Sequence, residues 1–148
     1  MKKLVIVLVA GLLSIQLMAN TNTDINEKVK ASFKATFPNA QSVKWHENGN
    51  TFTVSFIRNS IDHRVEYDTE GNIIQTTRFY GEQNLPAYLL AQVKKRFEGK
   101  KIHIVTELSS DAGMEFHITL HDAKKWYLVK AYANGMMEVY DQFKKQKS

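Results

Sequence analysis

The stretch VKASFKATFP, residues 29–38, places an apolar side chain at every fourth position and then ends in proline. Residues four apart lie along one side of an α-helix and proline cannot continue it, so the stretch predicts an amphipathic helix that ends before Pro38. The stretch LLAQVKKRF, residues 89–97, repeats the spacing, and Gly99 follows it. The apolar positions of the two stretches are Val29, Phe33 and Phe37, and Leu89, Val93 and Phe97. A repeat of this length indicates two copies of one small helix-plus-sheet unit.

Apolar and polar residues alternate in four runs after each helical stretch. Such alternation, rich in β-branched and aromatic residues, is typical of half-buried strands. The runs are residues 42–47, 51–57, 61–67 and 72–77 in the first copy, and 101–108, 114–121, 125–131 and 136–140 in the second. Gly71 and Gly135 mark a turn near the end of each copy. The sequence therefore predicts an α+β fold, in which one domain contains two tandem helix-plus-four-strand repeats.

Short loops set the expected strand pairing. A two-residue loop at Asn59-Ser60 pairs residues whose numbers sum to 119. A two-residue loop at Asp122-Ala123 gives the corresponding sum of 245 in the second repeat. The first register opposes Phe52 with Tyr67, Val54 with Val65 and Phe56 with His63; the second opposes Phe116 with Val129, Ile118 with Tyr127 and Glu115 with Lys130. Both registers match apolar with apolar residues on one face, which a one-residue slip would destroy.

The ends of the two helices carry further signals. Asp24, with Glu27 three residues later, predicts the start of the first helix, and Pro86 suits the first turn of the second. A basic patch follows at the end of the second helix, comprising Lys94, Lys95, Arg96, Lys100 and Lys101. We interpret this patch as a solvated helix end whose charge complements the helix dipole. The alternative is contact with an anionic membrane surface or glycan.

Residues 1–19 have the layout of an export signal. Lys2 and Lys3 precede an apolar run that extends to Met18, and the small residue Ala19 precedes Asn20. This pattern predicts cleavage after Ala19 and a periplasmic or secreted protein with no stable membrane span after cleavage. The alternative is an uncleaved N-terminal anchor. The run is short for a bilayer span, which needs about 20 apolar residues.

Composition excludes several kinds of chemistry. The chain contains no cysteine, which rules out disulfides, cysteine-bound metal and thiol catalysis. Its net charge of +5 falls by two when Lys2 and Lys3 leave with the signal. Nucleic-acid-binding proteins usually carry a concentrated basic face, so this mild charge predicts no nucleic-acid partner.

A resemblance to a known family extends over nearly all of the mature chain. It rests on the stretch from Val29 to Pro38, on Ala40, Val43 and Trp45, on the turn Tyr67-Asp68-x-x-Gly71, and on Leu85-Pro86. The chain resembles the PepSY-like family of exported bacterial proteins, which is described as related to β-lactamase inhibitory protein. The resemblance implies a PepSY-like domain over residues 20–148, with repeats over about 24–80 and 84–141. It also implies one antiparallel sheet with both helices on one face, and it implies little about function. The chain departs from that secreted inhibitor in lacking disulfides, and Gly99 to Lys101 replaces the proline-containing helix exit of the first repeat.

Candidate catalytic and metal-binding residues are sparse. His117 and His121 lie four apart in a strand, where that spacing spans about 13 Å and cannot serve one ion. His103 could lie near His117, but no third ligand follows from the pattern. The two carboxylates of the turn at 68–71 are too few for a calcium loop, which indicates a plain β-turn. No hydrolase, zinc or phosphate-loop motif is found in the sequence, so we expect no catalytic residues, no metal and no cofactor.

One face of the predicted sheet carries a mixed set of aromatic and charged residues. Trp126 shares a polar strand face with Leu128, and such a residue on a polar face suggests a contact patch. The predicted binding residues are Lys44, His46, Arg64, His117, Trp126 and Lys130. The alternative is that the C-terminal segment around Tyr140 and Phe143 covers Trp126. We expect the polar tail to fray from about Gln142. The strand that contains Trp45 is too short to show which face Trp45 uses.

These observations favour an exported, non-catalytic protein-binding module that acts through the open sheet face, inhibitor-like, on an envelope or extracellular protein. A second hypothesis is an envelope protein that binds a small ligand between helices and sheet. The sequence indicates neither the partner nor the oligomeric state.

Overall fold

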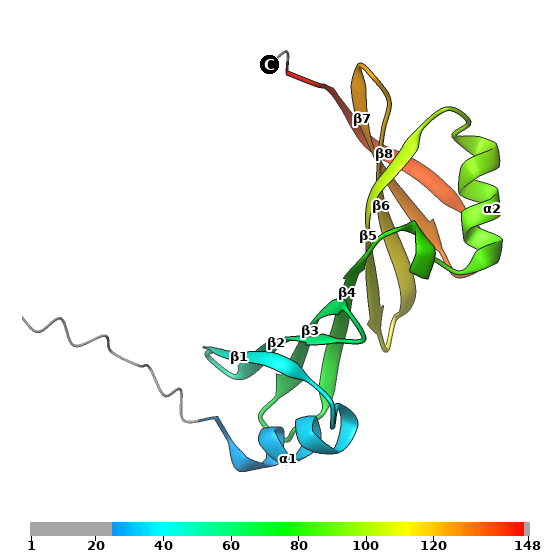
Figure 1. The fold of residues 1–148 in the computed structure, drawn as a ribbon. Helices are drawn as coiled ribbons and strands as arrows, with labels where there is room; N and C mark the ends of the chain where they lie inside the picture. Colours follow the sequence, from blue (N-terminus) through cyan, green and yellow to red (C-terminus); the bar gives the residue numbers. More distant parts are fainter. Residues whose placement is uncertain (1–24, 147–148) are drawn as a thin grey trace, which may run out of the picture.

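In the described part of the chain, eight strands follow one another in chain order across a single antiparallel sheet, and a helix precedes each group of four (Figure 1). The computed structural model describes residues 25–146. The first repeat contains α1 (Glu27–Thr36), β1 (Gln41–Asn48), β2 (Thr51–Arg58), β3 (Ile61–Asp68) and β4 (Ile73–Tyr80). The second contains α2 (Ala87–Arg96), β5 (Lys101–Ser110), β6 (Gly113–His121), β7 (Lys125–Tyr132) and β8 (Met137–Lys144), with a short 3₁₀ turn η1 (Glu82–Asn84) before α2. The predicted α+β fold of two helix-plus-four-strand repeats is confirmed.

The helix boundaries follow from capping groups. The Asn26 side-chain oxygen accepts a hydrogen bond of 2.8 Å from the amide of Lys28, which caps the start of α1. The predicted cap Asp24 lies outside the described residues, as does the predicted signal, residues 1–19. At the other end the Phe37 amide donates to the Phe33 carbonyl at 2.8 Å, and Pro38 stops the helix there. Within residues 25–146 no helix is long and apolar enough to cross a membrane.

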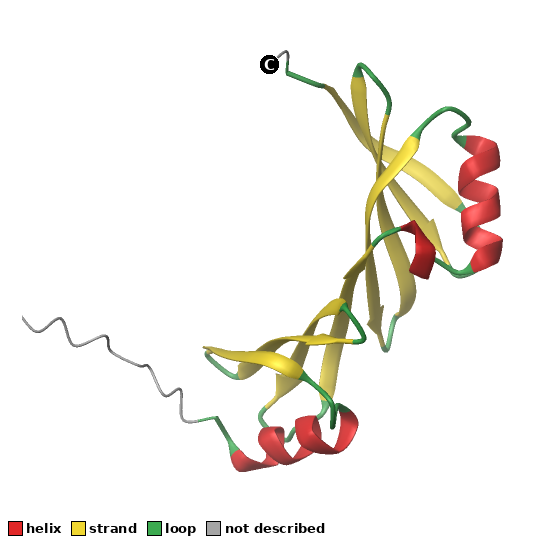
Figure 2. Ribbon diagram, viewed as in Figure 1, coloured by secondary structure: helices red, strands yellow, loops and turns green. Residues whose placement is uncertain are grey.

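Both helices pack on the same face of the sheet, as the strand pairing shows. Residues directly opposite in antiparallel strands share a face. His63 of β3 lies opposite Arg78 of β4, and two residues along β4 the same face presents Tyr80. From there the face continues through the paired residues Tyr80 and Val105, Val105 and Ile118, and Ile118 and Val129. The predicted placement of both helices on one face is therefore confirmed, and Figure 2 shows them at opposite ends of that sheet.

Each helix covers its own apolar core. The first core consists of Ile25, Val29 and Phe33 packed on Phe52, Val54, Phe56, Val65 and Tyr67. The second consists of Leu85, Leu89, Val93 and Phe97 packed on Ile61, Tyr80, Val105, Phe116, Ile118, Leu120, Val129 and Ala131. Trp45, whose face the sequence left open, joins the first core with its ring 5.3 Å from that of Phe33. The second core includes Ile61 from β3, so it extends into the first repeat.

The first predicted hairpin register is correct and the second is wrong. Phe52 lies opposite Tyr67, and Asn59 and Ser60 form the loop with φ of 51° and 59°. In the second hairpin His121 lies opposite Trp126, so paired numbers sum to 247 instead of the predicted 245. The Asp122 carboxylate explains the difference, because it accepts hydrogen bonds from the amides of Lys124 and Lys125 at 2.7 and 2.8 Å. These bonds stabilise a loop that is two residues longer than the predicted one. Because the strand pairing shifts by two residues, every side chain stays on its predicted face.

The predicted pairs of Phe116 with Val129 and of Ile118 with Tyr127 are replaced accordingly. Phe116 lies opposite Ala131, and Ile118 lies opposite Val129. Glu115 lies opposite Tyr132 rather than Lys130, and its carboxylate reaches the Lys130 ammonium diagonally at 3.7 Å.

The C-terminal segment is ordered strand where we expected fraying from Gln142. Strand β8 runs to Lys144, which pairs with Lys125 of β7. The Lys145 amide then donates to the Lys124 carbonyl at 2.8 Å. These backbone hydrogen bonds order the polar end of the chain, although its composition alone does not predict an ordered strand.

A buried polar group joins the two repeats on the helix-covered face. Glu107 of β5 is 6 % exposed, and its carboxylate accepts hydrogen bonds from the Tyr80 hydroxyl and from Arg78 Nη1, the latter at 2.9 Å. Burial and the neighbouring Glu107 carboxylate raise the pKa of Tyr80 far above its usual range, so this phenol remains a donor. The contact ties β4, the last strand of the first repeat, to β5, the first of the second.

His63 is the half-buried histidine that the apolar register predicted opposite Phe56. Its ring stacks on Phe56 with centroids 4.9 Å apart and an interplanar angle of 11°. Burial lowers the pKa of His63 below its usual value of 6.5, and the positive charges of Arg78 and Arg58 lower it further. The neutral imidazole is thus the form that the folded protein prefers.

We expect this histidine to make the folded state less stable in mild acid. The unfolded chain binds a proton on His63 below about pH 6.5, where the folded chain still resists protonation. The free energy of unfolding should therefore fall as the pH drops through about 6.5 and level off below the folded pKa. Urea unfolding of wild type and His63→Phe at about pH 7.5 and about pH 5.5 measures this, and the variant should lose part of the decrease. His46→Gln, a change at an exposed histidine, serves as control; a decrease of equal size in wild type and His63→Phe would contradict the assignment.

Candidate functional site

The six predicted binding residues all lie on the sheet face that the helices leave uncovered, called the open face below. Lys44 of β1 lies opposite Ser55 of β2, which lies opposite Arg64 of β3, and these alternate with core residues along each strand. His117 of β6 lies opposite Lys130 of β7 on the same face. The structure therefore separates the six into two groups, with Lys44, His46 and Arg64 in the first repeat and His117, Trp126 and Lys130 in the second.

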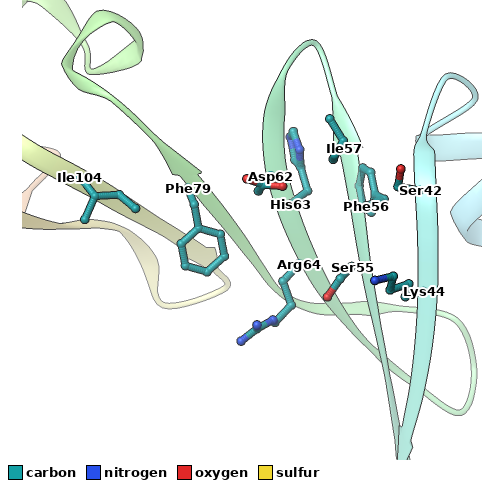
Figure 3. Close-up of a pocket in the computed structure, with 10 residues that line it drawn as sticks. All are labelled: Ser42, Lys44, Ser55, Phe56, Ile57, Asp62, His63, Arg64, Phe79 and Ile104. Carbon is teal, nitrogen blue, oxygen red and sulfur yellow. The ribbon is translucent and has the colours of Figure 1, made fainter.

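Two of the three residues in the first group border a hollow of about 470 Å³ in the open face (Figure 3). Lys44 and Arg64 lie on its lining together with Ser55. Its apolar lining includes Ile57, Phe79 and Ile104, of which Ile57 and Ile104 are each 37 % exposed. Sequence reasoning missed these three side chains. Phe79 could have been found if the run at 72–77 had been extended along the same alternation to residue 79.

Charge in the hollow is only partly balanced. Among the described residues neither Lys44 nor Arg64 forms an ion pair, and Asp62 is the acidic residue on the lining. The Arg64 guanidinium carbon lies 5.7 Å from the centre of the Phe79 ring, within range of a cation–π interaction. The hollow thus combines two available cations with an apolar, aromatic lining.

The second group contains a hydrogen-bonded network. His117 Nε2 lies 2.8 Å from a Glu115 carboxylate oxygen, and the Lys130 ammonium lies 3.7 Å from the other oxygen. The hydrogen bond from His117 and the charge of Lys130 together lower the pKa of Glu115. On its other side His117 Nδ1 lies 3.5 Å from the Tyr140 hydroxyl. A carboxylate–imidazole pair could orient a base, but within residues 25–146 we find no serine, threonine or lysine side chain bonded to His117.

Trp126 is half-buried at the far end of the open face. Its ring centroid lies 5.0 Å from those of both His103 and His121. The Lys145 ammonium lies 4.8 Å above the Trp126 ring and 2.9 Å from His121 Nδ1. The C-terminal segment therefore does cover part of Trp126, through Lys145, and Phe143 of β8 lies opposite Trp126 in the strand pairing.

The histidine geometry differs in one respect from the prediction. The pairing of β5 with β6 shifts between Ile102 and Ile104, so His103 is an extra residue in a β-bulge. The bulge places the His103 ring next to that of His121, with centroids 6.2 Å apart, rather than next to His117, a position that the sequence had allowed. Across the described part of the chain no three histidine or acidic side chains gather closely enough to hold a metal ion.

The basic patch at the end of α2 is partly used within the fold. Lys94 pairs with Glu82 at 3.2 Å, and Arg96 Nη1 donates to the Met137 carbonyl at 2.7 Å. The Lys100 ammonium lies 4.7 Å above the Tyr127 ring. Three of the five predicted cations thus contact other groups of the fold near α2 and the loop that follows it.

The interface between helices and sheet is filled by side chains. Val29 and Leu89 are 0 % exposed and Val93 is 1 % exposed, and all three pack against strand residues of their own cores. A depression of about 530 Å³ lies at the end of α2, bordered by Lys94, Phe97 and Lys100. Its lining also includes Lys101 and Ile102 at the start of β5.

The architecture has close counterparts among solved structures, whereas no protein-family model and no curated protein matches the chain. A BLIP-like protein from Bacteroides fragilis is 18 % identical, with a TM-score of 0.62 over 82 % of this chain and 86 % of that one. A DUF2874 family protein from Bacteroides ovatus is 15 % identical, with a TM-score of 0.63 over 80 % of this chain and 86 % of that one. A protein from Bacteroides eggerthii, provisionally described as periplasmic, is 17 % identical, with a TM-score of 0.62 over 80 % and 87 %. The chain therefore has a BLIP-like fold, named after β-lactamase inhibitory protein.

Proposed function

We propose that this chain is an exported, non-catalytic protein-binding module of the PepSY-like family that acts through its open face, inhibitor-like, on an envelope or extracellular protein. The observation that carries the proposal is the composition of that face. It presents Lys44 and Arg64, which form no ion pair within residues 25–146, next to the apolar side chains of Phe79 and Ile104, and the helices cover the other face. Accessible apolar patches with polar rims are typical of protein interaction sites.

The fold supports this proposal in a second way. A wide, uncovered antiparallel sheet offers a surface across eight strands, and the neighbour from Bacteroides fragilis is BLIP-like. The filled interface between helices and sheet favours surface binding over the alternative of a small ligand in that interface. In the described chain no serine, threonine or lysine side chain is bonded to His117, which supports a binding role over catalysis.

The proposed location is the periplasm or the medium, after cleavage of a signal following Ala19. The sequence of residues 1–19 supports export. The provisional description of the Bacteroides eggerthii neighbour as periplasmic agrees with this location.

A capture experiment with a matched pair of double variants tests the function. The mature protein is immobilised and exposed to envelope extract of the source cells, and retained proteins are quantified by mass spectrometry. Arg64→Ala/Trp126→Ala removes one anchor from each group on the open face, whereas Lys34→Ala/Lys95→Ala changes two exposed cations on the helices. We expect wild type and the helix variant to retain the same protein, and the open-face variant to lose it by at least about tenfold.

Circular dichroism and thermal unfolding establish that the open-face variant is folded before it is used. Equal retention by all three proteins would overturn the assignment of this face. Retention of nothing above the bare matrix by wild type would overturn the binding function itself.

A further inference from the structure

The hollow in the open face has a defined pattern of charge across three strands. Lys44, Ser55 and Arg64 are directly paired across β1, β2 and β3. Neighbouring strands lie about 4.8 Å apart, so the backbones at Lys44 and Arg64 are about 10 Å apart with a serine hydroxyl between them. Both cationic side chains are long enough to approach an anion held above Ser55.

The two cations are available to a partner. Within residues 25–146 neither Lys44 nor Arg64 has a carboxylate partner, whereas Lys130 on the same face pairs with Glu115. Asp62 on the lining offsets one of the two positive charges, which leaves the hollow with a net positive charge. A guanidinium binds a carboxylate through two parallel hydrogen bonds, and an ammonium adds a point charge.

The lining beside these cations is apolar. Figure 3 shows the Phe79 ring beside Arg64, with Ile104 farther along on the same side. The 470 Å³ volume of the hollow falls in the range of side-chain-sized and small-ligand sites. An occupant that fits both parts must carry a negative charge within a few ångströms of an apolar group.

We infer that the hollow binds a carboxylate that lies next to an apolar side chain, as presented by an Asp or Glu beside a large apolar residue on a loop of the partner protein. This inference rests on the proposed function, since it gives the chemistry of the partner at that face. Arg64 holds the carboxylate, Lys44 adds positive charge, and Phe79 with Ile104 and Ile57 contacts the apolar group. Charge complementarity selects this occupant over a neutral or basic segment.

A small probe tests the inference without the partner. The ¹⁵N-labelled mature protein is titrated with 3-phenylpropionate, which joins a carboxylate to an apolar ring, and with the neutral amide of the same acid. We expect saturable shifts of the backbone amides of Ser55, Arg64 and Phe79 with the carboxylate, and much weaker binding of the amide. Arg64→Gln should weaken carboxylate binding at least about tenfold and Lys44→Gln by about threefold, since a charge-assisted pair is stronger than a single point charge.

The control variant Lys34→Gln changes an exposed cation of helix α1, on the helix-covered side of the sheet, and it should bind the probe as wild type does. Equal binding of the acid and the amide, unchanged binding by Arg64→Gln, or shifts confined to residues 94–101 would each overturn the inference. If 3-phenylpropionate does not bind while the Arg64→Ala/Trp126→Ala variant loses the envelope protein, the inference about the hollow is wrong and the proposed binding through the open face is retained. If 3-phenylpropionate binds while wild type captures no envelope protein, the inference about the hollow is retained and the proposed function is wrong.

Discussion

Replacing Glu107 by alanine is expected to lower the free energy of unfolding by about 3 kcal/mol. The carboxylate is 6 % exposed and accepts hydrogen bonds from the Tyr80 hydroxyl and Arg78 Nη1. Removing one partner of a buried pair leaves the other charge uncompensated, which costs about 3–5 kcal/mol. The Arg78 side chain retains 34 % exposure and can recover some hydration, which places the effect at the lower end of that range.

Equilibrium unfolding in urea measures the effect, and two further variants make it specific. Glu115→Ala removes a half-exposed carboxylate from the open face and should change the unfolding free energy by less than about 1 kcal/mol. The double variant Arg78→Leu/Glu107→Leu replaces both charges with apolar side chains and should be more stable than Glu107→Ala. A Glu107→Ala protein within about 1 kcal/mol of wild type would show that the buried contact contributes little to stability.

Glu107 also illustrates what the sequence could not reveal. Alternation correctly places residues 101–108 in a strand, and it puts Glu107 on the same face as Val105, but it does not show that a carboxylate on that face is buried. Its partner Arg78 is 29 positions away and just beyond the strand predicted at 72–77. Arg78 and Glu107 meet because β4 of the first repeat pairs with β5 of the second. That pairing belongs to the tertiary structure and does not follow from the alternation within either strand.

The strand pairing within a hairpin was predictable where the length of its loop could be read from the sequence alone. The first register followed from apolar matching and from a two-residue loop in which Asn59 and Ser60 both take positive φ. The second failed because the Asp122 side chain binds the backbone of its own loop, and apolar matching allows a shift of two.

On the open face, too, some features follow from the sequence of a single strand and others depend on how separate strands pair. Period-two alternation placed all six predicted residues correctly, since a strand's face needs no knowledge of its neighbours. The surroundings of Trp126 depend instead on the bulge at His103 and on the position of Lys145, which arise from pairing between separate strands. Sequence therefore predicted which residues share the face, but neither the hollow beside Lys44 and Arg64 nor the side chains that surround Trp126.

Replacing Leu89 by alanine is expected to lower the free energy of unfolding by about 3 kcal/mol, within the range of about 2–5 kcal/mol that Leu→Ala changes in packed cores show. The side chain is 0 % exposed and belongs to the second core. The control is Val29→Ala at the equivalent position of α1, which is also 0 % exposed but removes one carbon fewer. We expect that change to cost about 2 kcal/mol, from about 0.8 kcal/mol per buried methylene plus a smaller cavity.

The two tryptophans show whether this loss reaches the other repeat, because Trp45 lies against the first core and Trp126 lies on the second repeat. Urea unfolding is followed by fluorescence in Trp45→Phe and Trp126→Phe backgrounds, each of which leaves one reporter. We expect Leu89→Ala to lower the midpoint equally for both reporters, since Ile61 of β3 packs in the second core and β4 pairs with β5 from Gln75 to Tyr80. A wild-type midpoint at Trp45 with a lowered midpoint at Trp126 would instead mean that the repeats unfold independently. In that case the polar contact at Glu107 would join two separately stable units, and its loss should leave each of the two midpoints unchanged.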